Sequence, residues 1–326
     1  MPSRFPFTSF PAGWFRIAAG SSLPAGKVQA LRYFGRDLVL FRTEDGRANL
    51  LDAHCPHNGA HLGHGGKVGG NTIECPFHGW RIGGDGACVS IPYTEKIPAG
   101  ARTRSWPVDE VNGQIMAWHD SSGREPGWRI PEFPEYSSAE WTAFDQGDHW
   151  VIRTHVQELG ENGVDSAHFP FLHSQQTSRM RTESVDVDGH IFVHRTFQYY
   201  NVFGLAKLLV PEVSGPLDVT LYGLGCAVNR TCVDAKLKLH YTFAFYFTPV
   251  DEEHTEVNSI LAMRRMPMPF ANRILLRKAI REGRKTIDQD VPIWENKVYR
   301  ERPALCDGDG PIMQYRRWAA QFYAVP

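Results

Sequence analysis

The sequence predicts an α+β protein in which a small all-β domain, residues 1–124, precedes a larger domain of strands and long helices, residues 125–326. Three observations lead to this prediction. Short apolar runs alternate with turn dipeptides over residues 14–120, which is typical of an all-β domain. A proline-rich stretch at residues 126–134 indicates a linker, and residues 268–299 have the pattern of one long helix.

In chain order, the strands expected in the first domain are residues 38–42, 49–51 and 114–118, because each follows a turn that contains glycine. The strands expected in the second domain are residues 196–200 and 237–248, because both are rich in β-branched and aromatic residues. We expect the first domain to carry its functional residues on two loop tips, since loops held by a rigid scaffold often bear such sites.

Two short motifs, Cys55-Pro-His57 and Cys75-Pro-Phe-His78, carry the most informative residues. Two thiolates and two imidazoles are the ligand set of a Rieske-type [2Fe-2S] cluster. A zinc finger is the alternative, but it has two cysteines in one pair and two histidines in the other, whereas each motif here contains one of each. We therefore predict that Cys55 and Cys75 bind one iron and that His57 and His78 bind the other.

A second motif lies between Glu161 and His173 and contains an asparagine, an aspartate and two histidines. A helix that continued to His168 would place Glu161, Asp165 and His168 on one face, so that the Asp165 carboxylate could orient the His168 imidazole. Pro170 is expected to end this helix, and the turn would bring the two imidazoles together. Two imidazoles and a carboxylate form the facial triad of non-heme Fe(II) oxygenases. The alternative interpretation is that both histidines belong to the core and have backbone partners.

The carboxylate of this triad has two candidates, Asp288 and Asp290. Asp290 falls within an apolar stripe of the expected long helix, whereas Asp288 falls on a polar face. The stripe consists of Ile287, Val291, Trp294 and Val298. A buried carboxylate needs a partner or a metal, so we choose Asp290, although Pro292 must distort the helix nearby.

The two metal motifs, in this order, resemble the Rieske non-heme iron oxygenases over nearly the whole chain. The resemblance implies a C-terminal domain of helix-grip architecture, an antiparallel sheet wrapped by a long helix. It also implies that Fe(II), held by His168, His173 and Asp290, binds O2 as the co-substrate. Electrons would pass from the cluster at His78 through Asp165 to His168 of a neighbouring subunit, within a homotrimer. Asn162 matches a family position close to the iron, where an amide hydrogen-bonds without ligating.

Within this family, five segments resemble the 3-ketosteroid 9α-hydroxylase oxygenases and the cholesterol 7-desaturases: residues 169–173, 289–297, 307–311, 315–318 and 321–323. This resemblance implies a small apolar substrate, a steroid or sterol, that is hydroxylated or desaturated. An aromatic O- or N-demethylating Rieske monooxygenase is the alternative. A Rieske electron-transfer protein without oxygen chemistry belongs to another class, and it would have no use for the second metal site.

Composition and the remaining motifs restrict the partners. The formal net charge of −1 gives no excess of positive charge that would indicate binding to nucleic acid or to an anionic membrane. The sequence has neither the glycine-rich loop of a dinucleotide-binding fold nor a plant-type run of four cysteines. We therefore expect NAD(P)H to act only indirectly, through a separate flavin or iron–sulfur reductase or a ferredoxin.

The N-terminus lacks the pattern of a signal peptide, and no apolar run is long enough to span a membrane. The animal cholesterol 7-desaturases carry a membrane-spanning segment before the Rieske domain, whereas this chain begins almost at that domain. We therefore expect a bacterial-type hydroxylase without a membrane anchor. The four cysteines outside the cluster motifs are expected to be buried free thiols in a reducing, cytoplasmic environment: Cys88, Cys226, Cys232 and Cys306.

Overall fold

The computed structural model describes four stretches of the chain, residues 4–7, 9–201, 213–234 and 238–323. The first residue of the expected strand 237–248 lies outside these stretches. Contacts divide the chain into two compact units. We call residues 12–131 and 248–252 the Rieske-motif unit, and residues 1–11, 132–247 and 253–326 the second unit.

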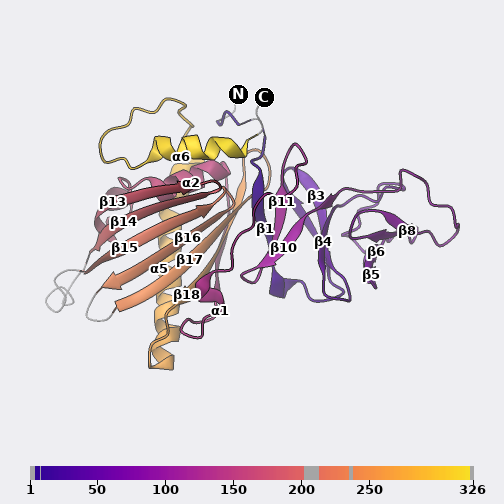
Figure 1. Ribbon diagram of the computed structural model, residues 1–326, viewed down its shortest axis with the longest axis horizontal. Helices are drawn as coiled ribbons and strands as arrows, with labels where there is room; N and C mark the ends of the chain where they lie inside the picture. Colours follow the sequence, from indigo (N-terminus) through magenta and orange to yellow (C-terminus); the bar gives the residue numbers. More distant parts are fainter. Residues whose placement is uncertain (1–3, 8, 202–212, 235–237, 324–326) are drawn as a thin grey trace. The chain divides into compact units, whose positions relative to one another are not determined.

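The Rieske-motif unit consists of short strands. They are β1 (Gly13–Ala19), β2 (Val28–Tyr33), β3 (Arg36–Arg42), β4 (Ala48–Asp52), β5 (Lys67–Gly69), β6 (Thr72–Glu74), β7 (Arg81–Gly83), β8 (Cys88–Ser90), β9 (Ser105–Trp106), β10 (Val108–Val111) and β11 (Gln114–His119), with one 3-10 turn, η1 (Gly20–Ser22). They form three antiparallel sheets in the orders β1-β11-β10, β2-β3-β4-β9 and β5-β6-β7-β8 (Figure 1). The expected strands 38–42, 49–51 and 114–118 are confirmed as β3, β4 and β11.

The second unit contains one large sheet and several helices. Its strands are β12 (Asp145–Ile152), β13 (Thr177–Asp188), β14 (Ile191–Tyr200), β15 (Val213–Tyr222), β16 (Cys226–Asp234), β17 (Lys238–Pro249) and β18 (Thr255–Met263). Its helices are α1 (Pro134–Ser137), α2 (Val156–Val164), α3 (Phe169–Leu172), α5 (Pro269–Asn296), α6 (Ile312–Ala319) and the 3-10 turn η2 (Ala320–Phe322). The seven strands follow the order β12-β18-β17-β16-β15-β14-β13 (Figure 1).

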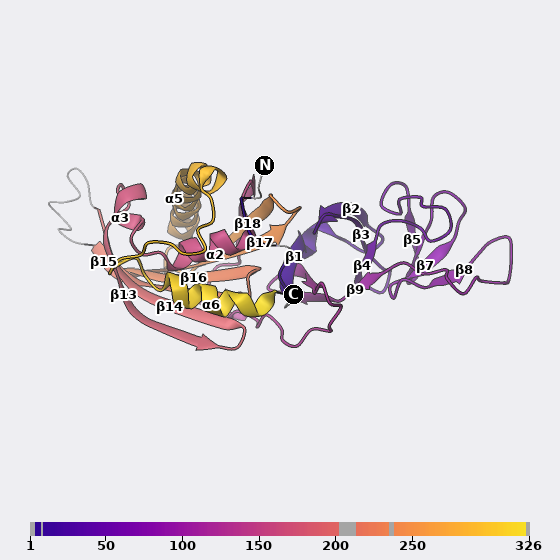
Figure 2. The same ribbon diagram turned by 90° about the horizontal axis from the view of Figure 1, so that it is seen from above.

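Helices α2 and α5 pack on one face of this sheet (Figure 2). Val219 and Phe243 both lie opposite Asn229 in neighbouring antiparallel strands, so their side chains share a face. A Cβ atom on Gly163 of α2 would lie 3.4 Å from Val219, and one on Gly283 of α5 would lie 3.1 Å from Phe243. The sheet and α5 thus form the expected helix-grip arrangement, and glycine permits the close approach of α5.

Helix α5 confirms the long helix expected over residues 268–299, and it continues through Pro292. The predicted apolar stripe is correct at Trp294, which is buried, but wrong at Val298. Val298 lies beyond the last residue of the helix and is 49% exposed. None of the described helices combines the length and the apolar character that a membrane span needs.

The four cysteines outside the cluster motifs are free thiols, as expected. Cys88 and Cys226 are buried, but the prediction of burial was wrong for Cys306, which is exposed, and Cys232 is half-buried. Cys306 lies in the segment between α5 and α6, outside the core.

A buried ion pair fixes α1 to the opposite face of the large sheet. Arg230 of β16 donates to both carboxylate oxygens of Glu135, at 2.6 and 3.1 Å, and Thr242 of β17 donates to one of them at 3.1 Å. Burial favours a raised pKa for Glu135, but these hydrogen bonds outweigh burial and leave the pKa below its usual value. The carboxylate is therefore charged and paired in the folded protein.

We predict that Glu135→Ala lowers the free energy of unfolding by about 3 kcal/mol at neutral pH, because Arg230 loses its partner in a largely buried site. Since folding lowers the pKa of Glu135, its contribution is present above the ordinary glutamate pKa of about 4.3 and is lost as the pH falls below it. Urea unfolding followed by circular dichroism at pH 7 and at acidic pH measures both effects.

Glu140→Ala is the matched control, because Glu140 pairs with Arg264 at 2.8 Å on an exposed surface. We expect this control to lose less than about 1 kcal/mol. Equal losses for the two variants at neutral pH would contradict the structural role of Glu135.

Candidate metal centres

The two cysteine–histidine loops of the Rieske-motif unit have the same backbone hydrogen bonds. In each loop the cysteine amide donates to the carbonyl five residues later, and the amide four residues later donates back to the cysteine carbonyl. The pairs are Cys55 to Ala60 at 2.9 Å, Gly59 to Cys55 at 3.0 Å, Cys75 to Trp80 at 2.8 Å and Gly79 to Cys75 at 3.0 Å. The φ angles of Gly59 and Gly79 are 71° and 70°, in the left-handed region that glycine adopts without strain.

Cysteines and histidines occupy different depths in these loops. Cys55 and Cys75 are each 3% exposed and belong to a hydrophobic core, whereas His57 is exposed and His78 is half-buried. The two imidazole rings have centroids 4.6 Å apart, and His57 stacks on Trp80 at 4.4 Å. A cluster held here would have its cysteine-bound iron in the core and its histidine-bound iron near the surface.

The surroundings of the sulfur atoms also fit a cluster. Burial raises the pKa of the Cys55 thiol to about 11, and the neighbouring Cys75 thiol adds to this shift. The backbone amides of His57 and Asn58 oppose it, because they hydrogen-bond to the sulfur and favour its charged form. Buried thiols that carry little negative charge by themselves need a cation to become ligands.

A single zinc ion fits these loops less well. Tetrahedral zinc would hold its sulfur and nitrogen ligands within about 4 Å of one another. Among the residues that the structure describes, ligand atoms of at least three residues lie within 4.8 Å of one another only at His168, His173 and Asp290. The four ligands of the cysteine–histidine loops do not form such a group, which agrees with a larger two-iron cluster.

His168, His173 and Asp290 form the second candidate centre. His173 and Asp290 are 1% and 2% exposed, and His173 Nε2 lies 3.3 Å from Asp290 Oδ1. These two atoms have no hydrogen-bond partner among the described residues. Burial lowers the pKa of His173, but the neighbouring Asp290 carboxylate outweighs burial and leaves the pKa raised. Without a metal the protein favours a cation at this contact, so the donor set fits a divalent ion.

The prediction of one helix through His168 was wrong. Helix α2 ends at Val164, and Asp165 follows it as the C-cap. The Asp165 carboxylate accepts a hydrogen bond from the Ala167 amide at 3.0 Å, which gives the backbone an alternative to the next helical turn. Pro170 does not end α2 but lies in the first turn of the short helix α3, a position that proline tolerates.

Asp165 nevertheless lies beside His168, with Oδ2 at 3.7 Å from Nδ1, a separation that is too long for a hydrogen bond. Burial favours a raised pKa for Asp165, but the neighbouring His168 outweighs burial and keeps the pKa below its usual value. Asn162 lies on the other side of the ring, with Nδ2 at 3.4 Å from His168 Nε2. The aspartate and the asparagine thus face opposite nitrogens of one imidazole.

Glu161, in contrast, was wrongly placed on the face of Asp165 and His168. Its carboxylate accepts two hydrogen bonds from Arg316 of α6, at 2.6 and 2.8 Å. The neighbouring carboxylate of Glu158 is buried and pairs with Lys297 at 2.5 Å, just after α5. These two ion pairs connect α2 to α6 and to the end of α5.

The choice of Asp290 over Asp288 agrees with the structure, because Asp288 is half exposed and accepts a hydrogen bond from Trp150 at 2.9 Å. Sequence reasoning missed Gln289, whose Oε1 lies 2.8 Å from His173 Nδ1. Its only sequence signal is its place before Asp290, which puts an amide beside a carboxylate on one helix turn.

Sequence reasoning also missed a hydrogen-bond chain that supports the loop after α2. The buried His194 on β14 donates from Nδ1 to the Gly163 carbonyl at 3.5 Å, so its Nε2 accepts from Thr182 at 3.0 Å. Thr182 in turn lies 3.3 Å from the Ser166 hydroxyl. A buried histidine on a strand gives no distinctive signal in a sequence, because most such residues belong to the core.

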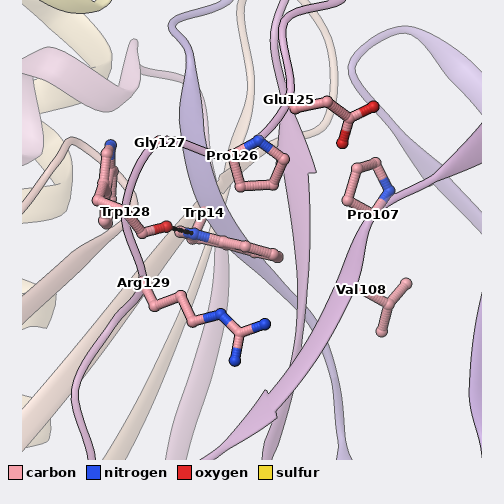
Figure 3. A pocket seen from close by; sticks show the side chains of 8 residues that line it. All are labelled: Trp14, Pro107, Val108, Glu125, Pro126, Gly127, Trp128 and Arg129. Carbon is pink, nitrogen blue, oxygen red and sulfur yellow. Dashed lines mark hydrogen bonds between the residues drawn. The ribbon is translucent and has the colours of Figure 1, made fainter.

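A hollow in the Rieske-motif unit contains none of the predicted site residues (Figure 3). It is lined by Trp14, Pro107, Val108, Glu125, Pro126, Gly127, Trp128 and Arg129 and has a volume of about 520 Å³. Trp14 donates a hydrogen bond to the Trp128 carbonyl at 2.6 Å in its wall. The single carboxylate in its lining does not provide a ligand set for a metal.

Comparison with known proteins identifies both parts of the chain. Residues 13–107 match the Rieske [2Fe-2S] domain family, and residues 117–323 match the 3-Ketosteroid 9alpha-hydroxylase C-terminal domain family. Cholesterol 7-desaturase nvd 1 of Ciona intestinalis is 35% identical, over 96% of this chain and 69% of that protein. The probable 3-ketosteroid-9-alpha-monooxygenase oxygenase component of Rhodococcus rhodochrous is 33% identical, over 96% of this chain and 80% of that protein.

The crystal structure of dicamba monooxygenase bound to dicamba has a similar fold, with a TM-score of 0.75 over 95% of this chain and 96% of that chain. The two sequences are 20% identical, so this likeness concerns the fold alone. Matches to both domain families and to relatives of more than 30% identity over nearly the whole chain agree with the two centres described above. The chain therefore belongs to the Rieske oxygenases, as an oxidoreductase with a Rieske [2Fe-2S] cluster and non-heme iron.

Proposed function

We propose that this protein is the terminal oxygenase of a Rieske monooxygenase system that hydroxylates or desaturates a steroid- or sterol-like substrate. One observation carries the oxygenase part of this proposal: His168, His173 and Asp290 converge in a chain that also contains a Rieske domain. An electron carrier without oxygen chemistry has no need for a second metal site. The steroid part rests on the match of residues 117–323 and on the names of the two relatives.

Each predicted site residue has a proposed role. Cys55, Cys75, His57 and His78 hold the cluster, while His168, His173 and Asp290 hold Fe(II). When bound, this ion provides open coordination positions for O2 beside the substrate. Asp165 orients the His168 ring through Nδ1, so that Nε2 is left for the metal. Asn162 is a hydrogen-bond donor close to that nitrogen.

The partners and the domain boundary are part of the same proposal. Electrons come from a separate reductase or ferredoxin, because an oxygenase component does not oxidise NAD(P)H itself. We propose a homotrimer, in which Asp165 connects His168 of one subunit to His78 of the next. Residues 1–124 are proposed as the cluster domain and residues 125–326 as the catalytic domain; the family matches, over residues 13–107 and 117–323, support two domains in this order.

The test is a single turnover of protein loaded with Fe(II), with the cluster reduced chemically and labelled O2 supplied. A 3-ketosteroid, a sterol and an aryl methyl ether are offered in separate reactions. Labelled alcohol from the steroid or sterol supports a hydroxylase, and a new double bond without label supports a desaturase. Formaldehyde from the ether alone would contradict the steroid assignment in favour of a demethylase, and a reduced cluster that discharges with none of the three would also contradict it.

For Asp290→Ala, we predict loss of the mononuclear iron with the cluster retained. Two imidazoles without the carboxylate bind Fe(II) weakly, whereas the cluster ligands lie in the other unit. Iron content measured beside the visible absorption of the cluster separates the two metals. Asp288→Asn is the control, because this exposed residue is expected to leave both metal contents unchanged; full iron occupancy and turnover in Asp290→Ala would reject the ligand assignment.

For Asp165→Asn, we predict normal contents of both metals but much slower reoxidation of the reduced cluster in a single turnover. The asparagine keeps the size of the side chain and can still accept from the Ala167 amide, but it removes the charge beside His168 Nδ1. Stopped-flow absorption of the cluster measures the rate. A rate equal to that of the wild type would exclude Asp165 from the electron path.

A further inference from the structure

Two consecutive residues of α5 contact the two nitrogens of one imidazole. Gln289 Oε1 lies 2.8 Å from His173 Nδ1, and Asp290 Oδ1 lies 3.3 Å from His173 Nε2. Successive helical residues point about 100° apart, so both side chains flank His173 while the preceding Asp288 points to Trp150 at the surface. The arrangement holds the ring from both sides.

The chemistry of the amide determines which nitrogen carries the proton. A carbonyl oxygen only accepts hydrogen bonds, so the contact with Gln289 Oε1 requires a proton on His173 Nδ1. In a neutral imidazole the lone pair is then on Nε2, the buried atom that lacks a hydrogen-bond partner among the described residues. This lone pair points to the contact with Asp290, where the proposed Fe(II) would bind.

We infer that Gln289 is the positioning residue of the mononuclear site, which fixes the tautomer and the ring orientation of His173 so that Nε2 is available as a ligand. The inference rests on the proposed function, because it requires His173 and Asp290 to bind the metal. It assigns a role to a residue that the ligand set itself does not include.

The neutral character of this partner is also significant. His168 has a carboxylate partner, Asp165, at 3.7 Å, whereas His173 has an amide. Asp165 and Asp290 together supply two negative charges, which balance a divalent cation in this buried site. A carboxylate at residue 289 would add a third negative charge, whereas the amide orients the ring without adding one.

The experiment measures the affinity of Fe(II) for the mononuclear site under anaerobic conditions, in full-length protein that retains its cluster. Gln289→Leu removes the acceptor, and we expect an affinity about 10–100-fold lower than that of the wild type. Gln289→Glu has oxygens that only accept, so we expect it to bind Fe(II) at least as tightly as the wild type. Cluster absorption and circular dichroism must be unchanged in both variants, which excludes a general loss of structure.

Gln289→Glu gives the sharpest distinction. If the amide of Gln289 served His173 through its NH2 group, the carboxylate of Gln289→Glu could not replace that donor. Gln289→Glu would then bind Fe(II) as weakly as Gln289→Leu, and the inference would be overturned. Equal affinities for Gln289→Leu and the wild type would overturn it as well. Asp288→Asn, which changes the preceding residue of the same helix, is the control and is expected to bind as the wild type does.

Asp290→Ala separates this inference from the proposed function. If the wild type binds no second iron, or if Asp290→Ala binds it equally well, the proposed metal site itself is wrong. If the wild type binds, Asp290→Ala does not, and Gln289→Leu is unaffected, only the role of Gln289 is wrong.

Discussion

The contact between His173 and Asp290 is the constraint on which the second unit depends. It places a carboxylate and an imidazole, both almost fully buried, 3.3 Å apart without an aligned hydrogen bond. Removing such groups from water is unfavourable unless a counter-charge or a metal compensates. The fold therefore has to hold two segments, the turn after α3 and the C-terminal part of α5, in a fixed relation while leaving their ligand atoms free for a cation.

Ion pairs and hydrogen bonds away from the ligands provide this rigidity. Glu161 with Arg316, and Glu158 with Lys297, connect α2 to α6 and to the end of α5. On the sheet side, His194 supports the end of α2 through the Gly163 carbonyl. None of these residues reaches the candidate metal site, yet each fixes an element that carries a ligand or its partner. Ligand geometry in this unit is thus a property of its packing, which a ligand motif alone does not specify.

Sequence reasoning succeeded where chemistry is local. Cys55, His57, Cys75 and His78 lie in two loops with matched hydrogen bonds, as their spacing and residue types led us to expect. Helical periodicity placed Asp290 on the buried side of α5, and the structure has it 2% exposed, although Pro292 lies within the same helix. The helix through His168 was wrong because a single hydrogen bond, from the Ala167 amide to Asp165, competes with the next helical turn. Helix propensity and residue spacing do not predict this competing hydrogen bond.

The residues that were missed depend on contacts between distant parts of the chain. Gln289 and His173 are separated by 116 positions, and the sequence does not show which side chain of α5 will reach the second nitrogen of the ring. The same holds for Glu161. Its i, i+4 relation to Asp165 suggested that both side chains share one helix face, but Arg316, 155 positions away, binds the Glu161 carboxylate and determines where it points. Tertiary partners decide such cases, because a surface pair within a helix contributes only about 0.5 kcal/mol.

The C-terminal segment shows how a family resemblance and a chemical role differ. Residues 315–318 and 321–323 contributed to the resemblance to steroid-acting enzymes, yet Tyr315 and Arg316 hold other parts of the protein in place. Tyr315 is fully buried and donates to the Gln157 carbonyl at 2.8 Å, while Arg316 holds Glu161. Both contacts position α2, the helix that carries Asn162 and leads to Asp165. The resemblance of this segment therefore reflects a shared fold. The choice of substrate must depend on the side chains that line the space beside the metal site.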